Sequence, residues 1–176
     1  MNRERPGRTA PSGAAVGAES IAYALGETLR GPAWHGPSAR AALRGITAST
    51  ASWRAEGVAH CIWELVLHMA YARHRTLGRL GVIADAFPHR LEKPWWPRLP
   101  ESLDEGAWRS DVKLLFALDD ELLGAVAAIP SGVLARPRGA GARALGGELL
   151  GVAMHDAYHT GQIRLLARMH ERERRP

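Results

Sequence analysis

Four long segments of this chain place apolar residues at the spacing of an amphipathic helix, and this periodicity limits the fold more than any other feature. The expected helices cover about residues 18–30, 57–80, 102–130 and 148–170. Residues three and four positions apart share one face of a helix, so each segment presents an apolar stripe to a core. No segment shows the period-2 alternation of a strand. The sequence therefore predicts an all-α protein.

Proline and glycine separate these helices with long connections. Gly31 and Pro32 end the first helix, and Ser38 begins a short extra helix. Residues 87–100 contain the run Pro-Trp-Trp-Pro and cannot form a regular helix, so we expect a long crossover loop there. Residues 131–146 are predicted to form a second loop. Four amphipathic helices joined in this way favour a four-helix bundle, whose facing helices can hold a metal.

Length and composition are typical of one globular domain. The chain has 176 residues, of which 46% are hydrophobic and 23% charged. Residues 1–17 are rich in Gly, Pro, Ala and Arg and are predicted to be a disordered basic tail. We expect the bundle to occupy residues 18–170 and a short charged tail to occupy residues 171–176.

Charge and cysteine content argue against several classes of protein. The formal net charge is +5, but four of the five excess positive charges lie within residues 1–8 and 168–176. A nucleic-acid interface places its charge on an ordered element, so we expect no specific nucleic-acid binding. No apolar run is long enough to span a membrane, and no signal peptide is evident. Cys61 cannot form an intramolecular disulfide alone, which favours a cytoplasmic location.

Three histidines are candidate metal ligands. His155 and His159 are four residues apart on one face of the last helix, and His68 lies on the core face of the second long helix. Two neutral imidazoles at this spacing can share a metal, and a third from a facing helix completes the cradle. Three protein ligands leave positions open for water or substrate. The sequence therefore predicts one divalent metal ion, with Zn, Ni, Fe and Mn all compatible with imidazole.

Other polar residues near these histidines have more than one interpretation. Glu64 can orient a ligand or accept a proton from water, or it can be an ordinary helix carboxylate. Gln162 can hydrogen-bond within the site or cap the core. Four loop residues can form a lid or pocket wall, or simply pack: Trp34, His35, Trp95 and Trp96. Packing is the favoured interpretation for Trp34.

Asp156 occupies the place of the catalytic glutamate in the His-Glu-x-x-His motif of metalloproteases. The longer form of that motif needs a further glycine and histidine where this chain has Gln162 and Leu165, so we reject a protease assignment. Asp156 lies about 100° round the helix from His155, which favours a supporting or solvent-facing role. Three further histidines are expected to be solvated: His74, His89 and His170.

The segments around the candidate ligands resemble the DinB-like superfamily of metal-binding four-helix bundles. The resemblance is carried by residues 34–38, 60–68 and 149–163, and it extends over about residues 18–170. It implies a bundle with an unusual order of connections and a metal held by His68, His155 and His159. It also implies that a homodimer is possible.

The resemblance implies several functions. Some relatives are S-transferases or isomerases that use a low-molecular-weight thiol, whose pKa a divalent metal lowers. Others are metal-dependent hydrolases. We expect a metal-dependent enzyme acting on a small-molecule substrate with a thiol as cofactor; the alternatives are a hydrolase and a non-catalytic metal-binding stress protein. The basic loop at residues 136–143 could attract an acidic cofactor, but a loop rich in Gly, Arg and Pro is more often simply solvated.

Overall fold

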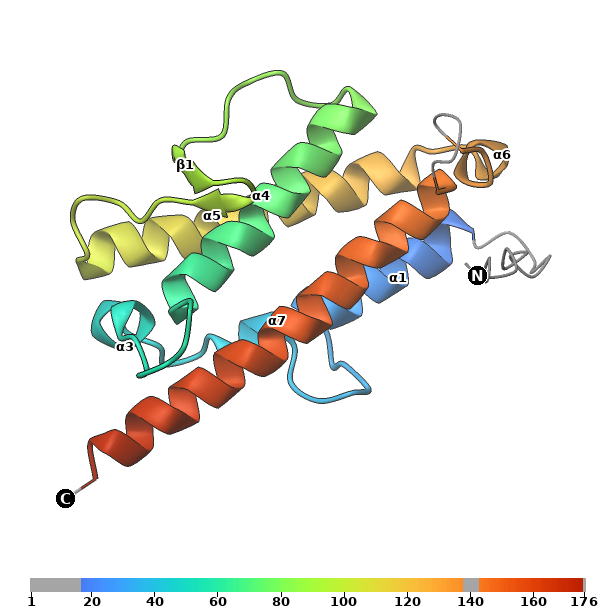
Figure 1. The fold of residues 1–176 in the computed structure, drawn as a ribbon. Helices are drawn as coiled ribbons and strands as arrows, with labels where there is room; N and C mark the ends of the chain where they lie inside the picture. Colours follow the sequence, from blue (N-terminus) through green and yellow to red (C-terminus); the bar gives the residue numbers. More distant parts are fainter. Residues whose placement is uncertain (1–16, 138–142, 176) are drawn as a thin grey trace, which may run out of the picture.

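The computed structural model describes residues 17–137 and 143–175, and its long helices form a bundle (Figure 1). These are α1 (Ala18–Leu29), α4 (Ile62–Leu80), α5 (Glu105–Ala127) and α7 (Leu145–Glu173). Helices α1 and α4 each pack against both α5 and α7, so they occupy opposite corners. The predicted all-α bundle is confirmed. The proposed N-terminal tail falls on residues that, except for Gly17, lie outside the described part of the chain.

Short helices fill the connections between the long ones. They are α2 (Ala39–Ala42), α3 (Ala48–Ser52) and α6 (Ser131–Leu134). Helix α2 is the short helix predicted after Ser38. The Ser38 side chain caps it by accepting a hydrogen bond from the Ala41 N–H. Helix α6 lies where only a loop was expected. None of the helices formed by the described residues is long and apolar enough to cross a membrane.

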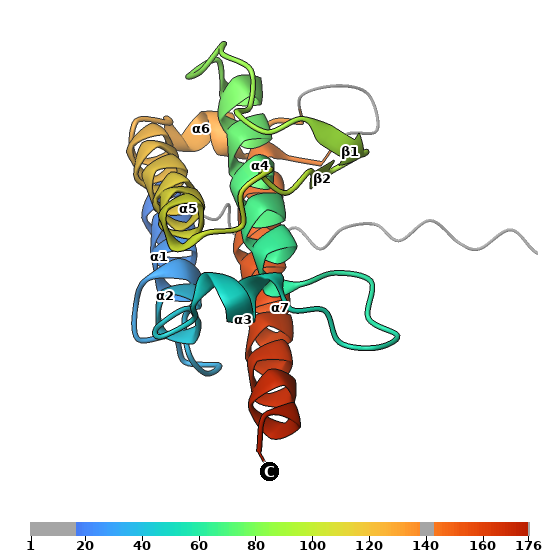
Figure 2. The ribbon, with the colours of Figure 1, turned by 90° about the vertical axis from the view of Figure 1, so that its left-hand side faces the viewer.

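Helix α4 is buried on nearly all sides over its first three turns. It packs between α5 and α7, and its first turn also contacts the region of α3 (Figure 2). A helix in this position needs apolar residues all round rather than one stripe. The buried residues include Ile62, Trp63, Leu65, Val66, Leu67, Met69 and Ala70. His68 belongs to this buried segment, so its imidazole is enclosed by the bundle.

Helix boundaries differ from the sequence-based expectation where a side chain caps the helix. Helix α4 begins at Ile62, five residues later than expected, because the Glu64 carboxylate accepts the Cys61 N–H at 2.9 Å. The helix expected from residue 102 begins later, at Glu105. Asp104 is the N-cap of α5 and accepts the Ala107 N–H at 2.8 Å, while Ser102 donates to Asp104. Helix α7 continues to Glu173, beyond the expected boundary at residue 170.

The crossover at residues 87–100 contains a small hairpin that the sequence did not indicate. Strands β1 (Leu91–Lys93) and β2 (Trp96–Pro97) pair antiparallel, and β2 packs on α4 (Figure 2). These strands are too short for a period-2 pattern to be recognised. Between them, Trp95 adopts a φ of 73°, a conformation that is rare for a bulky residue.

A buried ion network links the four long helices. Arg73 of α4 is fully buried and donates to Asp119 of α5 at 3.1 Å and to Asp156 of α7 at 2.9 Å. Asp119 also accepts a hydrogen bond from Arg30, at the end of α1, at 2.7 Å. Burial opposes ionisation of Asp156, but the charge of Arg73 prevails and lowers the pKa of Asp156. Asp156 is therefore a supporting residue, and the solvent-facing alternative is wrong.

Candidate metal centre

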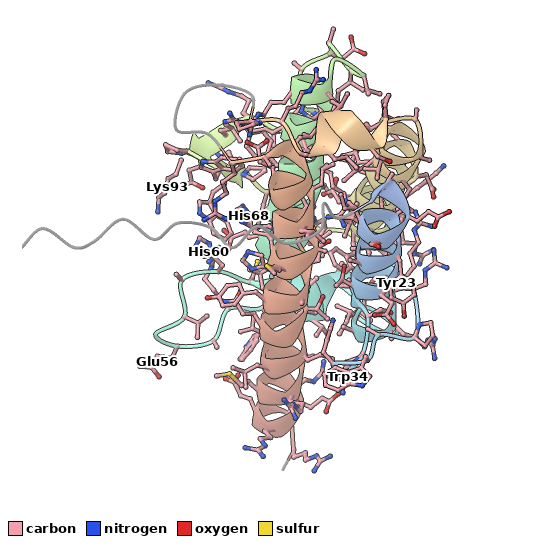
Figure 3. The ribbon with its side chains drawn as sticks, turned by 90° about the vertical axis from the view of Figure 1, so that its right-hand side faces the viewer. Tyr23, Trp34, Glu56, His60, His68 and Lys93 are labelled. Atoms are coloured by element: carbon pink, nitrogen blue, oxygen red, sulfur yellow. The ribbon has the colours of Figure 1, made fainter. Side chains whose placement is uncertain are left out.

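The structure brings the three predicted histidines together between α4 and α7. The Nε2 atom of His155 lies 2.8 Å from Nε2 of His68 and 3.1 Å from Nε2 of His159. The three candidate ligand atoms all lie within 4.8 Å of one another. Figure 3 shows His68 on the opposite side of α7 from Tyr23 and Trp34. We call this cluster of His68, His155 and His159 the histidine triad.

Hydrogen bonds at the far side of two rings determine which nitrogen faces the centre of the triad. The Nδ1 atom of His68 lies 2.7 Å from the carbonyl oxygen of Trp95, which can only accept a proton. The Nδ1 atom of His159 lies 2.6 Å from Oε1 of Gln162, which also accepts. Both rings therefore carry their proton on Nδ1 and direct a lone pair from Nε2 into the triad.

His155 has no tautomer that satisfies both of its nitrogens without a cation. A proton on Nε2 can serve only one neighbouring imidazole, and it leaves the buried Nδ1 without a partner. A proton on Nδ1 points toward the Asp156 carboxylate 4.0 Å away. In that tautomer the Nε2 atoms of all three histidines direct lone pairs at one another, which is unfavourable without a cation between them. A divalent cation would accept all three lone pairs, and the Nδ1–H groups of His68 and His159 would keep the acceptors behind them. The donor set therefore fits a metal.

Burial of two rings of the triad favours their neutral form, as metal ligation requires. Burial lowers the pKa of His68, and it lowers the pKa of His159 to about 4. His155 is only partly buried, so the triad is not sealed from its surroundings. This openness is the arrangement expected of a site that receives a ligand.

The tip of the hairpin crosses the bundle at the triad. The Trp96 ring stacks on His68 with centroids 4.2 Å apart, and on its other face it stacks on His60 at 3.4 Å. Trp95 has a left-handed backbone conformation, and its carbonyl oxygen contacts Nδ1 of His68. A bulky residue persists in such a conformation only where its surroundings impose it, and such residues cluster at functional sites. Trp95 and Trp96 are therefore walls of the site.

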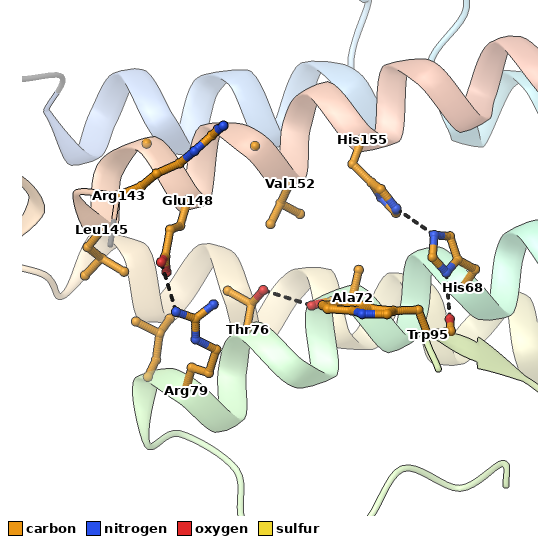
Figure 4. Close-up of a pocket in the computed structure, with 13 residues that line it drawn as sticks. His68, Ala72, Thr76, Arg79, Trp95, Arg143, Leu145, Glu148, Val152 and His155 are labelled. Carbon is orange, nitrogen blue, oxygen red and sulfur yellow. Dashed lines mark hydrogen bonds and ion pairs between the residues drawn. The ribbon is translucent and has the colours of Figure 1, made fainter. Parts of the chain in front are cut away.

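Two cavities lie on either side of the triad. The first has a volume of about 420 Å³, and among the residues that line it are His68, His155, Trp95, Arg79 and Arg143. Figure 4 shows the two histidines at one end of this cavity and Arg79, Glu148 and Arg143 at the other. The second has a volume of about 340 Å³, and its lining includes His60, Trp96, Tyr158, His159 and Leu165.

The structure also decides between the alternative roles of Glu64 and Gln162. Glu64 caps α4 and accepts a hydrogen bond from Arg54 at 2.7 Å. Burial opposes its ionisation, yet these hydrogen bonds lower the pKa of Glu64. Glu64 is thus an ordinary structural carboxylate. Gln162 instead hydrogen-bonds within the site, where it orients His159.

The expected environments of four side chains are wrong. Trp34 does not pack: it is 94% exposed, in a turn of the loop between α1 and α2 where the Gly36 N–H donates to the Ala33 carbonyl. His170 is not solvated: it is buried with its ring 5.2 Å from Trp53. His74 and His89 are half-buried and have partners, the Asp85 carbonyl and the Asp111 carboxylate respectively. His35 is exposed and lies outside the triad.

The buried network around Arg73 was not predicted. Two arginines and two aspartates on four different helices have no common spacing in the chain, so periodicity could not reveal them. The only available signal was a charged residue, Arg73, within the apolar face of α4.

Comparison with known proteins identifies a family for this fold and site. Residues 34–163 match the DinB superfamily, and this segment covers more than half of the chain, including all three histidines of the triad. Neither the curated proteins nor the solved structures that were compared with the chain include a match.

Proposed function

The chain belongs to the DinB superfamily, and from that premise we propose that it is a metal-dependent enzyme that activates a low-molecular-weight thiol for transfer to an electrophile. The observation that carries the proposal is the convergence of three imidazole Nε2 atoms at the junction of two cavities. A divalent metal held there would supply positive charge that lowers the pKa of a thiol, and three neutral ligands would leave that charge undiminished.

The residues of the chain would prepare this reaction by orienting the ligands and by surrounding the site with apolar side chains. The Trp95 carbonyl and Gln162 hold two imidazoles in the tautomer that ligation needs. Trp96 keeps the His68 ring in its plane by stacking. Apolar side chains line both cavities, among them Val152 and Leu166. An apolar enclosure strengthens the electrostatic stabilisation of a thiolate relative to that in water.

The transfer itself requires no oxidant or reductant. The thiol proton leaves to solvent, and the sulfur forms a bond to an electrophilic carbon of the substrate. The bond between that carbon and its leaving group breaks, and the leaving group takes the electron pair. Activation of water at the same site is the competing reaction, because a divalent metal can also lower the pKa of water.

Metal content is the first test of the proposal. We expect about one divalent ion per chain in the native protein by elemental analysis, and a large loss of metal in His155→Ala. His35→Ala is the matched control, because His35 is an exposed histidine outside the triad, and it should retain the metal. Full retention in His155→Ala combined with His68→Ala and His159→Ala would contradict the assignment.

Spectroscopy of the Co(II)-loaded protein separates the two reactions. Addition of glutathione, bacillithiol or mycothiol should produce intense near-ultraviolet charge-transfer absorption. If none of these thiols changes the spectrum, and a small ester is hydrolysed in a metal-dependent manner, the protein is a hydrolase.

A further inference from the structure

The two cavities beside the triad follow one another along the same pair of helices. On α7, the residues that line the first cavity precede His159, and those that line the second follow residue 157. On α4, the order is reversed: the first cavity extends from His68 toward Leu80, and the second reaches back to Leu65. Trp95 lines the first cavity and its neighbour Trp96 lines the second. The triad and the hairpin tip therefore lie between two separate chambers.

The first chamber has charge at the end away from the triad. Arg79 forms an ion pair with Glu148 at 2.9 Å, and Arg143 adds a second guanidinium, so the described residues that line this end carry one net positive charge. Figure 4 shows this group facing His68 and His155 across Ala72 and Val152. Glu148 and His155 are seven residues apart on α7, which corresponds to about 10 Å along the helix. Guanidinium groups bind carboxylates in preference to neutral groups.

The second chamber has a different chemistry. Among the described residues that line it, none is Lys, Arg, Asp or Glu. Its walls are apolar and aromatic, with Leu165 and Val58 at exposed positions. Such a surface favours a neutral apolar or aromatic molecule, because an anion would lose its hydration without gaining a partner.

We propose that the two chambers bind two different ligands at once: a carboxylate-bearing thiol in the first and an uncharged apolar electrophile in the second. The thiol lies with its sulfur at the His68–His155 end and its carboxylate at Arg143. The electrophile approaches the triad from the His159 side. The assignment of a thiol and an electrophile to the two chambers rests on the proposed function. The binding of each class of ligand can nevertheless be measured without turnover.

Binding of 6-mercaptohexanoate and of its neutral analogue 6-mercaptohexanol by calorimetry tests the first chamber. The carboxylate should increase affinity about tenfold, which corresponds to about 1.4 kcal/mol and one charge-assisted contact. Arg143→Gln should abolish this preference, whereas Arg143→Lys should retain part of it. Arg168→Gln is the control, because Arg168 is exposed on α7 and lies outside both chambers.

Binding of 2-naphthol tests the second chamber. Leu165→Lys should weaken it about tenfold and leave 6-mercaptohexanoate unaffected, because the substitution replaces an apolar wall of the chamber with a hydrated ammonium group that a bound apolar ring would have to desolvate. Met154→Lys introduces the same charge on α7 at a position that is 72% exposed and lines neither chamber, so it should bind as the wild type does.

Two results would overturn the inference: competition between 2-naphthol and 6-mercaptohexanoate for one site, or a carboxylate preference that survives Arg143→Gln. Lack of binding of either probe at millimolar concentration would also overturn it. Hexanoate, which has no sulfur, separates this inference from the proposed function. If hexanoate binds in an Arg143-dependent manner while thiols leave the Co(II) spectrum unchanged, the thiol chemistry fails and the two-chamber arrangement stands.

Discussion

Gln162 acts on the triad through a single hydrogen bond. Its Oε1 atom is 2.6 Å from Nδ1 of His159, and its Nε2 atom donates to the Tyr158 hydroxyl at 3.3 Å. The second hydrogen bond orients the amide so that its oxygen faces His159. A histidine ligand held in this way is more basic and better oriented than a free imidazole.

Gln162→Leu should therefore weaken metal binding about 10- to 100-fold, because His159 loses the acceptor that fixes its tautomer. Competition with a chromogenic chelator measures this change. Gln162→Glu keeps an acceptor oxygen at the same position and should retain tight binding. Equal affinities for wild type and Gln162→Leu would show that the hydrogen bond has no influence on the metal.

His159 also makes the stability of the metal-free protein depend on pH. Its pKa is about 4 in the folded protein, below the usual value of 6.5, because the ring is buried. Between these values the unfolded chain takes up a proton that the folded protein does not, so stability is present above pH 6.5 and decreases as the pH falls toward 4. His68 shifts in the same direction.

Urea unfolding of the metal-free protein at pH 7 and pH 5 tests this dependence. The midpoint for the wild type should be lower at pH 5, and His159→Gln should show a smaller difference between the two conditions. An identical pH dependence in the variant would assign the effect to other groups.

Among the helices, α4 ends at a glycine whose backbone conformation other residues rarely adopt. Gly81 is the C-cap, with a φ of 76°, and the Val82 N–H bonds to the Leu77 carbonyl to close the last turn. A Cβ atom at Gly81 would contact no atom within 4 Å, so substitution brings conformational strain and no steric clash. The loop toward the hairpin starts at this residue.

Gly81→Ala should lower the free energy of unfolding by about 1 kcal/mol, because alanine disfavours the left-handed conformation. Gly78→Ala, one turn earlier within the helix, should instead raise it by about 0.5–1 kcal/mol. Its Cβ would meet only the Ile83 carbonyl oxygen at an ordinary 3.8 Å. Denaturant unfolding of both variants provides the comparison, and destabilisation by both would argue against the conformational explanation.

At the scale of the whole molecule, the buried ion network connects the four long helices. Asp119 accepts hydrogen bonds from Arg73 and Arg30, and Asp156 accepts two from Arg73. Because Asp156 precedes His159 by one turn and follows His155 directly, the network also holds the α7 half of the triad in place. Removal of one member leaves a charge without its partner inside the bundle.

Asp119→Ala should therefore destabilise the protein by about 3–5 kcal/mol in urea unfolding. The neighbouring Asp120 provides a matched control: it pairs with Arg30 at the surface, and its side chain is 68% exposed. Asp120→Ala should cost less than about 1 kcal/mol, as solvent-exposed ion pairs usually do. Similar costs for the two variants would show that the buried pair adds no more than the exposed one.

The sequence by itself determined the features that depend on local spacing. The helical periodicity of four segments was sufficient for the all-α bundle, and the spacing of His155 and His159 placed two imidazoles on one face of α7. The expectation that His68 faces them also follows from periodicity, because His68 lies on the buried side of α4. These inferences hold because side-chain direction in a helix repeats regularly along the chain.

Only the tertiary structure decided the contacts between distant residues. The approach of Trp95 to His68, the burial of Arg73 between two aspartates, and the division of the site into two chambers depend on how the helices and the hairpin cross. The exact start of α4 likewise depends on a side-chain cap at Glu64. Helical periodicity cannot predict these contacts, because each contact joins residues whose separation in the chain is unrelated to helical spacing.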